Sequence, residues 1–472
     1  MVGIIILVSF IIGVQVPIVN KLSFAEVQKI LTKPAATAPS VKTPEVNQPV
    51  STQELGGSSS WEIRKIVWTG AVNIWKANPV FGTGVETYAF AYYKYRPVEH
   101  NRVSEWNFLY NKAHNEYLNY LATTGIVGLF TYLLFISFFL FLISINLFNK
   151  KVKPIRYIGA FKADSKWDHE DPFLLALLTS FISILIINFF GFSVVILNIY
   201  LLLIPAFVLI LLDLVKGERI EAAKNVYISY AQWIGVAFFG IIGLFMLFML
   251  VRFWYADTKY ALGANYSGAG QYQVAYPLLQ DAVKLRNEPV FRDQLAVNDS
   301  ALAATLALQG ASESAGTVQN LATEALGISE KLTTAYPNNV VFWKSRVRIL
   351  YTLSNLDPRF LPMALVAIKK TSELAPTDAS ILYNLGVLYG QNGDSKNAVE
   401  VLEKTVEYKP DYREAHFALA VFYHELAVDK NSKIIDATYH KKAIDRLEYI
   451  LKYILPTDAQ SKQFLDQWNK EQ

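Results

Sequence analysis

Residues that could support chemistry gather between positions 61 and 130. Arg64 and Lys65 lie where apolar residues recur at helical spacing, which predicts an amphipathic helix to about Ala77. Asn78-Pro79 would end this helix, and Gly82-Thr83-Gly84 permits a tight turn. Exposed amides in such a turn could hold phosphate oxygens, although glycines serve turns more often than ligands.

His114 is the candidate for proton transfer, because a histidine can act as a general base near neutral pH. It lies in Lys112-Ala113-His114-Asn115, directly before a helical run whose N-terminus favours anions. On residue types alone, a histidine that caps a loop is the commoner interpretation, and an arginine such as Arg64 is usually solvated. His100-Asn101 is a second His-Asn pair, but it lacks the following helical run. Arg96 and Lys112 are further cations that could meet phosphate.

The helical run after His114 becomes one of several membrane spans. Five stretches reach the length of about 20 apolar residues that a bilayer requires: Met1 to about Val19, Gly125 to Phe148, Phe173 to Phe192, Val194 to Val215, and Ile228 to Phe253. The first stretch lacks a basic leader and a small-x-small cleavage site, which favours a span over a signal peptide.

Basic residues in short loops predict the orientation of these spans. The loop at 149–169 and the loop at 216–227 carry the lysines and arginines, so we expect both to be cytoplasmic. Residues from about 20 to 124 and everything after about residue 254 would then lie outside the cytoplasm. Residues 21–60 comprise a short amphipathic piece followed by a Pro-, Ser- and Thr-rich stretch that predicts a disordered linker.

The composition agrees with a membrane protein. Hydrophobic residues make up 53% of the chain and charged residues only 18%, below the quarter or so typical of soluble domains. The net charge is 44 − 40 = +4, which gives no reason to expect nucleic acid as a partner. No cysteine is present, which excludes disulfides, thiolate nucleophiles and cysteine-bound zinc.

Residues 254–472 contain internal repeats. The clearest unit has Leu385, Gly386, Tyr389, Ala398 and Leu402, at the spacing typical of tetratricopeptide repeats, and closes at Pro410. A second unit has the same offsets at Leu262, Gly263, Tyr266, Ala275 and Leu279. Weaker units end at Pro337 and Pro376, and a last one carries an insertion. The expected fold class is therefore all-α: a polytopic helical membrane domain (the first span and the four spans of 125–253) followed by an α-solenoid of four or five stacked repeats.

The order of Arg64, the Asn78-Pro79-x-x-Gly82-x-Gly84 turn and the Ala113-His114-Asn115 element with Gly125 resembles the O-antigen ligase and polymerase family. The resemblance covers about residues 1–215 and is most specific over 61–130. It implies metal-independent glycosyl transfer at the outer face of a bacterial cytoplasmic membrane, with no cofactor. The donor would be a glycan on undecaprenyl diphosphate, and the acceptor a glycan or a protein. His114 would then act as the catalytic residue near the acceptor, and Arg64 would bind the diphosphate.

The sequence departs from the family in one respect. Full members carry many more spans before the large loop, whereas this chain begins one span before it. Three explanations fit this departure: a C-terminal piece of a longer protein, a true start that lies upstream, or a split gene. Two alternatives stay open. One is a membrane-anchored scaffold whose repeats bind a protein partner without catalysis. The other is a transporter or channel, which the lack of charges near the centres of the spans disfavours.

Overall fold

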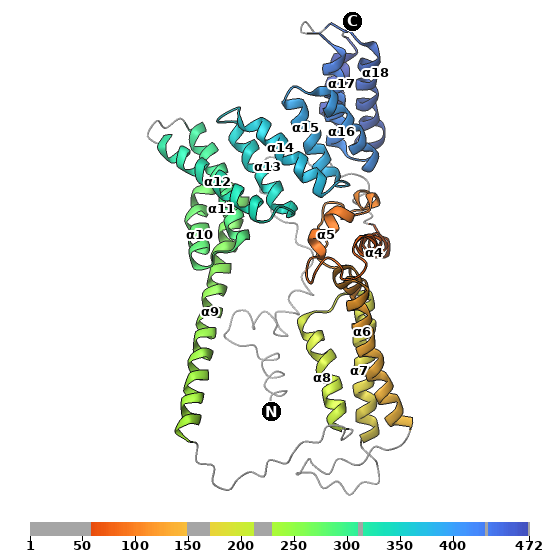
Figure 1. Cartoon of the computed structure of the whole chain (residues 1–472). Coiled ribbons are helices and arrows are strands. Elements are labelled where there is room, and N and C mark those ends of the chain that lie inside the picture. Colours follow the sequence, from red (N-terminus) through yellow and green to blue (C-terminus); the bar gives the residue numbers. More distant parts are fainter. Residues whose placement is uncertain (1–57, 149–169, 212–228, 310–314, 430–432, 471–472) are drawn as a thin grey trace, which may run out of the picture. The chain divides into compact units, whose positions relative to one another are not determined.

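The computed structural model describes residues 58–148, 170–211, 229–309, 315–429 and 433–470 (Figure 1). Within these ranges every regular element is a helix, so the all-α prediction is confirmed. The predicted first span, the amphipathic piece with its linker, and the two basic loops lie outside the described residues.

Three described helices are long and apolar enough to cross a membrane: α6 (Glu116–Phe148), α7 (Glu170–Phe190) and α9 (Tyr230–Gly268). A shorter apolar helix, α8 (Val195–Leu211), has 17 residues and contains Pro205. Helix α9 continues without a break from apolar sequence into the first repeat. The predicted domain boundary at residues 253 and 254 therefore falls inside a single helix.

Residues 58–115, which we call the motif loop, fold into a small helical unit. Helix α4 (Ser60–Ala77) begins at Ser59, whose side chain accepts the Glu62 amide at 3.2 Å, and matches the predicted helix. Helix α5 (Tyr88–Tyr95) and the 3₁₀ turn η1 (Val98–Arg102) follow. The apolar face of α4 packs on the rings of Tyr88 and Tyr92. Gly70 permits this approach, because a Cβ there would lie 2.4 Å from the Tyr92 ring.

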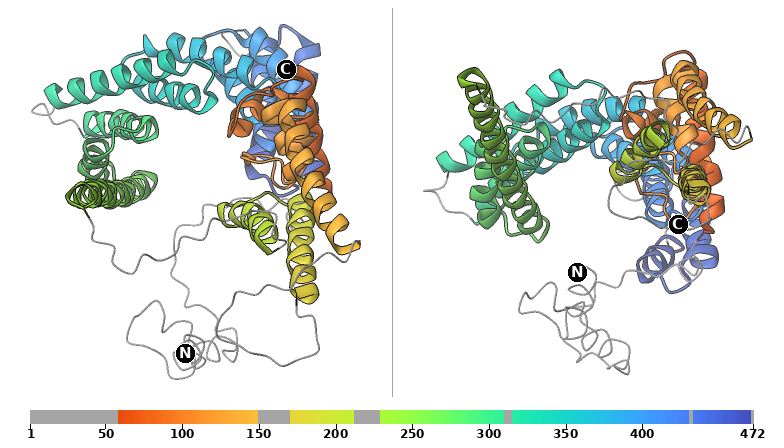
Figure 2. Two further views of the ribbon diagram at one scale, coloured as in Figure 1. Left: turned by 60° about the horizontal axis from the view of Figure 1, so that its bottom comes forward. Right: turned by 90° about the horizontal axis from the view of Figure 1, so that it is seen from below.

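The C-terminal part consists of antiparallel helix pairs that follow α9 in chain order (Figure 2). The helices are α10 (Tyr272–Leu285), α11 (Pro289–Leu308), α12 (Ala315–Ala335), α13 (Val340–Ser354), α14 (Phe360–Leu374), α15 (Ala379–Gln391), α16 (Ser395–Tyr408), α17 (Arg413–Ala427), α18 (Ala437–Tyr449) and α19 (Ala459–Trp468), with a π-helical turn at Ile450–Ile454.

The repeat glycines explain why the two predicted units share their central positions. A Cβ on Gly386 would lie 2.6 Å from Cγ of Leu402, and one on Gly263 would lie 2.7 Å from Cγ of Leu279. The first pair joins α15 to α16, and the second joins α9 to α10. In both repeats the missing side chain lets the two helices approach closely enough to bury a leucine.

Candidate functional site

The frame of the site is a break in α6. Gly125 has φ 66° and ψ −165°, which interrupts the helix. Two amides beyond the break leave the helix ladder and bond to the turn that follows α4. The Ile126 amide donates to the Pro79 carbonyl at 2.9 Å, and the Val127 amide donates to the Val80 carbonyl at 3.3 Å. A side chain on Gly125 would meet the Val80 carbonyl oxygen at 2.3 Å.

The glycine turn in its turn donates hydrogen bonds to α6. The carbonyls of Ala122 and Thr123 lose their helical partners at the break and accept the amides of Thr83, at 3.2 Å, and Gly84, at 2.8 Å. The Gly82 amide donates to Asn78 at 3.1 Å. The three amides that could have held phosphate oxygens are thus bonded to backbone carbonyls. The phosphate-cradle hypothesis for this turn is wrong, and the turn instead fixes the start of α6.

His114 lies at that start. Asn115 caps α6, since its side-chain oxygen accepts the Leu118 amide at 3.0 Å, so the helix cap is not His114. His114 has φ 52°, a left-handed conformation that few residues other than glycine adopt. Its ring makes edge contacts with Tyr110, at 5.5 Å between centroids, and with Phe192, at 5.3 Å. The backbone and two aromatic rings therefore hold the imidazole in one place.

Arg64 acts electrostatically on His114. Partial burial is the main cause that lowers the pKa of His114, and the positive charge of Arg64 lowers this pKa further, whereas Glu105 opposes the shift. Both Arg64 and His114 are half-buried. Neither side chain has a hydrogen bond or an ion pair to any residue in the part of the chain that the structure describes. The fold thus brings Arg64 near enough to His114 for its charge to act on the imidazole.

Tyr110 is a site residue that the sequence reasoning missed. Its hydroxyl donates to the Glu105 carboxylate, and its ring lies between His100 and His114. Burial and the Glu105 charge raise the pKa of Tyr110 well above its usual value, so the hydroxyl stays protonated. The dense aromatic residues of the motif loop were the available signal, but nothing in their spacing singled out this one.

The other two cations that the sequence offered for phosphate, Arg96 and Lys112, have protein partners. Lys112 forms an ion pair with Glu86 at 2.5 Å. Arg96 is buried, and its guanidinium pairs with Asp378 at 3.4 Å and donates to the Asn101 side chain at 2.6 Å. A buried, paired guanidinium is unavailable to a substrate. The hypothesis that Arg96 meets phosphate is therefore wrong, and Arg64 remains the candidate for that role.

Comparison with known proteins bears on this site directly. The family model described as O-antigen ligase matches residues 1–133, which include Arg64, the glycine turn and His114. A tetratricopeptide repeat model matches residues 379–412. Residues 1–133, which we call the ligase domain after this family model, are thus similar to O-antigen ligases, and residues 379–412 are similar to a tetratricopeptide repeat, as the residue pattern predicted.

Solved structures similar to this chain include repeat proteins. A thermophilic TPR protein of Thermus thermophilus has 18% identity and a TM-score of 0.32, covering 45% of this chain and 98% of its own. The pilF protein of Pseudomonas aeruginosa has 14% identity and a TM-score of 0.31, covering 46% and 90%. Among curated proteins, none matches the chain.

His100-Asn101 has a structural role in the ligase domain. His100 is fully buried, its Nδ1 lies 2.8 Å from the Tyr92 hydroxyl, and burial lowers its pKa to about 4. Asn101 is also buried, and its amide donates to the Thr377 carbonyl at 2.8 Å while its oxygen accepts the Ala379 amide at 3.2 Å. The second His-Asn pair therefore links the ligase domain to the repeats, which agrees with the preference for His114.

Proposed function

We propose that this chain takes part in glycosyl transfer from undecaprenyl diphosphate to a glycan or protein acceptor outside the cytoplasm. The observation that carries the proposal is that the charge of Arg64, on α4, acts on His114, which lies directly before α6. One is a permanent cation and the other a histidine whose lowered pKa favours the neutral form. These are the two groups that the departure of a diphosphate and the attack of a hydroxyl require.

The residues divide the reaction between them. The neutral imidazole of His114 takes the proton of the acceptor hydroxyl, and the acceptor oxygen forms a bond to the anomeric carbon of the donor sugar. The bond from that carbon to the diphosphate oxygen breaks, and the lipid diphosphate leaves with the electron pair. The Arg64 guanidinium stabilises the negative charge that develops on it. Tyr110 and Phe192 restrict the imidazole to one orientation.

Variants of His114 test this assignment. His114→Asn is the sharper change, because asparagine tolerates positive φ and so keeps the backbone while it removes the base. His114→Ala is its companion. Expressed in the native cell at equal abundance, both should abolish the ladder of surface glycan and let the lipid-linked precursor accumulate. An unchanged ladder for His114→Asn would overturn the role of His114.

Arg64 has a matched control in its neighbour. Lys65 is exposed on the same helix, near the face of Trp61 at 5.4 Å. We expect Arg64→Gln to reduce transfer by about 100-fold, the scale of losing one stabilising group in a transition state. Lys65→Ala should leave transfer within about twofold, since exposed surface charges contribute little. Equal effects of the two changes would contradict a specific role for Arg64.

We also propose that the motif loop and the repeats are both extracytoplasmic, in a multi-pass protein. Asn101 donates to the Thr377 carbonyl and accepts the Ala379 amide, and these hydrogen bonds support the topology because they require both parts to lie on one side of the membrane. The chain has no cysteine, so single introduced cysteines give a clean test. Lys65→Cys and Lys396→Cys should react with an impermeant maleimide in intact cells, and Lys216→Cys should not. The opposite labelling would contradict the orientation.

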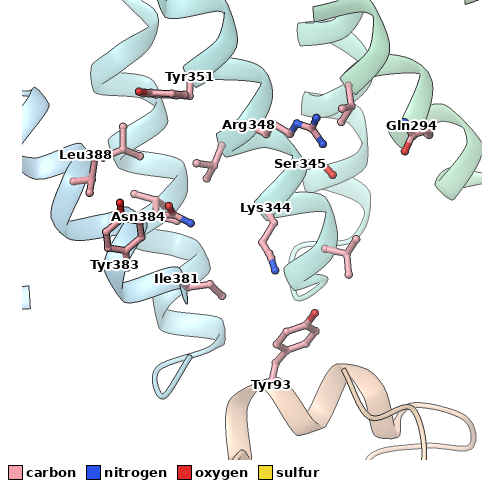
Figure 3. Close-up of a pocket in the computed structure, with 15 residues that line it drawn as sticks. Tyr93, Gln294, Lys344, Ser345, Arg348, Tyr351, Ile381, Tyr383, Asn384 and Leu388 are labelled. Atoms are coloured by element: carbon pink, nitrogen blue, oxygen red, sulfur yellow. The ribbon is translucent and has the colours of Figure 1, made fainter. Parts of the chain in front are cut away.

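The second candidate function is a membrane-anchored scaffold in which the repeats do the work. The repeat helices contain a cavity of about 670 Å³ (Figure 3), which favours ligand binding there. Deletion of the repeats separates the two candidates. A scaffold loses its role with them, whereas a transferase keeps His114-dependent chemistry and loses the choice of partner.

A further inference from the structure

The turn at residues 79–85 exposes large apolar side chains. Phe81 and Val85 are each 74% exposed, and Val80 is half exposed. Exposed apolar clusters mark sites that contact other proteins or membranes. Carbonyls of this turn accept the amides of Ile126 and Val127, whose side chains are also exposed and begin the long apolar part of α6. The apolar turn therefore continues the apolar surface of a helix that is long enough to cross a membrane.

Contacts between α6 and α7 show at which end of these helices the turn lies (Figure 1). The Tyr132 hydroxyl of α6 accepts the Asn188 side-chain amide of α7 at 3.4 Å. The ring of Phe139, later in α6, meets the ring of Phe181, earlier in α7, at 4.5 Å between centroids. The two helices are thus antiparallel, and the same pairing extended to residue 127 passes the C-terminal end of α7. The turn therefore lies at the level where the apolar parts of both helices stop.

Helix α4 presents tryptophan side chains at the same level. Trp61, Trp68 and Trp75 recur every seven residues, which places them along one side of the helix. The ring of Trp68 makes edge contacts with Phe189 of α7, at 5.9 Å between centroids, and with Trp61, at 5.5 Å. Phe189 is exposed and lies one residue from the end of its helix. Tryptophan is enriched where a membrane meets water, so these rings extend the surface of an apolar helix onto α4.

The charges of α4 indicate which partner covers this surface. The helix carries three basic residues and one acidic residue: Arg64, Lys65, Lys76 and Glu62. The Lys65 ammonium lies over the Trp61 ring at 5.4 Å. Lysine is depleted in protein–protein interfaces, whereas lysine and tryptophan together are typical of a helix that lies in a membrane surface. Anionic phospholipid headgroups attract the positive charge. The composition therefore favours a membrane over a second protein.

We propose that the motif loop binds the phospholipid surface of the membrane through the tryptophan side of α4 and the turn at residues 79–85. Phe81 and Val85 insert at the boundary between headgroups and acyl chains, and Lys65 extends its ammonium to the hydrated headgroups. This contact holds the loop at a fixed depth, and it does so whether or not the ligase domain transfers glycan.

One consequence rests on the proposed function. Arg64 lies three residues after Trp61 and four before Trp68, within about one helical turn of each. The membrane contact therefore places the Arg64 guanidinium near the depth of the lipid phosphates. A diphosphate carried by a membrane lipid reaches the same depth.

The test measures the surroundings of single labelled cysteines in the full chain, which has no cysteine of its own. Val85→Cys carries a bimane label in nanodiscs of phosphatidylglycerol and phosphatidylcholine. Val366→Cys, at a valine of α14 that is 68% exposed, is the matched control, and Phe138→Cys on α6 is the lipid reference. Nitroxide-labelled lipid and aqueous iodide are the quenchers. We expect nitroxide lipid to quench the labels at 85 and 138 several-fold more than the label at 366, and iodide to prefer 366.

Two results would overturn the membrane contact. One is iodide quenching at Val85 equal to that at Val366, which would place the turn in water. The other is shielding of the Val85 label from both quenchers, which would mean that protein covers the turn. Trp61→Cys reports on α4 in the same way. Quenching of that label by iodide alone would overturn the part of the proposal that concerns α4.

An inserted charge supplies the variant. In the labelled Val85→Cys chain, Phe81→Glu should weaken quenching by nitroxide lipid, because a carboxylate is costly among acyl chains, and Val366→Glu should not. His114→Asn should keep the parental quenching pattern, so loss of transfer and loss of membrane contact are separate results. Phe81→Glu should also raise the KM for a lipid-linked donor more than it lowers kcat. An unchanged KM would overturn the inferred depth of Arg64.

Discussion

The contact between Arg96 and Asp378 offers the sharpest test of how the ligase domain is attached to the repeats. Both side chains are almost fully buried, at 5% and 6% exposed. Arg96 has two further acceptors, the Asn101 side chain at 2.6 Å and the Trp106 carbonyl at 3.4 Å. Asp378 also accepts the amides of Ser380 and Ile381, and so caps α15. Each group is therefore charged, desolvated and held by several partners.

Asp378→Asn removes the negative charge of residue 378 and leaves its capping role intact. Asparagine is as good an N-cap as aspartate, so α15 keeps its cap while Arg96 loses its counter-charge. Removing one partner of a buried pair costs about 3–5 kcal/mol, most of it the uncompensated charge that remains. We expect a value of about 3 kcal/mol here, because Asn101 and Trp106 still accept from the guanidinium. Arg96→Met should cost about 2 kcal/mol, because two helix amides still solvate Asp378.

The double variant decides whether the pair interacts as the geometry implies. With both charges gone, no uncompensated charge remains, so the combined loss should fall short of the sum by about 1–3 kcal/mol. Hydrogen exchange of amides in 96–106, at several urea concentrations, measures the free energy of local opening. Lys370→Met, in the exposed Lys370–Glu373 pair of α14, should cost less than about 0.5 kcal/mol. Additive losses for Arg96 and Asp378 would refute the reasoning.

Three further predictions follow from particular residues. Gly125→Ala should destabilise the start of α6 by about 3 kcal/mol or more in thermal unfolding, because φ is positive and Val80 is in contact; Gly327→Ala, with open space around it, should be neutral or stabilising. Arg64→Gln should move the acidic limb of the pH–transfer profile to higher pH, because the pKa of His114 rises when the positive charge is removed; an unmoved limb would contradict their electrostatic contact. Burial raises the pKa of Asp299 to about 8, so the folded chain keeps a proton that the unfolded chain releases near pH 4. The free energy of unfolding should therefore fall by roughly 3–5 kcal/mol as pH rises from 4 to 8. Asp299→Asn should remove most of this slope, which thermal melts between those pH values measure, and a slope equal to that of the parent would refute the assignment.

Local patterns predicted the parts of the fold that depend on near neighbours. The spacing of Gly386 and Leu402 indicated a tight helix pair, and the structure brings these two residues into contact. The apolar period after Trp61 predicted the helix that the structure shows as Ser60–Ala77. Both features arise from residues within one or two helices, where periodicity alone specifies which faces meet.

The contacts that the sequence could not show join distant residues. From the sequence, Arg96 could not be distinguished from an exposed cation, because its partners come from the repeats. Its guanidinium pairs with Asp378, and its carbonyl accepts the hydroxyl of Thr377, which lies 281 residues away in the sequence. The glycine turn likewise resembled a phosphate loop. Its amides are bonded to carbonyls of α6 that become available only because Gly125 interrupts that helix. No local sequence pattern predicts the contact of Arg96 with Asp378 or the hydrogen bonds between the glycine turn and α6.

The hydrogen bonds between α6 and the glycine turn, which form because of the break at Gly125, also explain how the strained backbone around the site is tolerated. His114 and Glu86 both have positive φ, at a cost of about 1–3 kcal/mol each. The break gives up two helical bonds and forms four between α6 and the turn, a net gain of two at about 1 kcal/mol each. The Lys112–Glu86 pair then ties the strained turn to the segment that carries His114. The glycines of the motif thus support His114 by offsetting its strain, and the amides of Gly82 and Gly84 are bonded to backbone carbonyls. A change at Gly82 or Gly125 should therefore impair transfer through the position of the imidazole, even where Arg64 and His114 are intact.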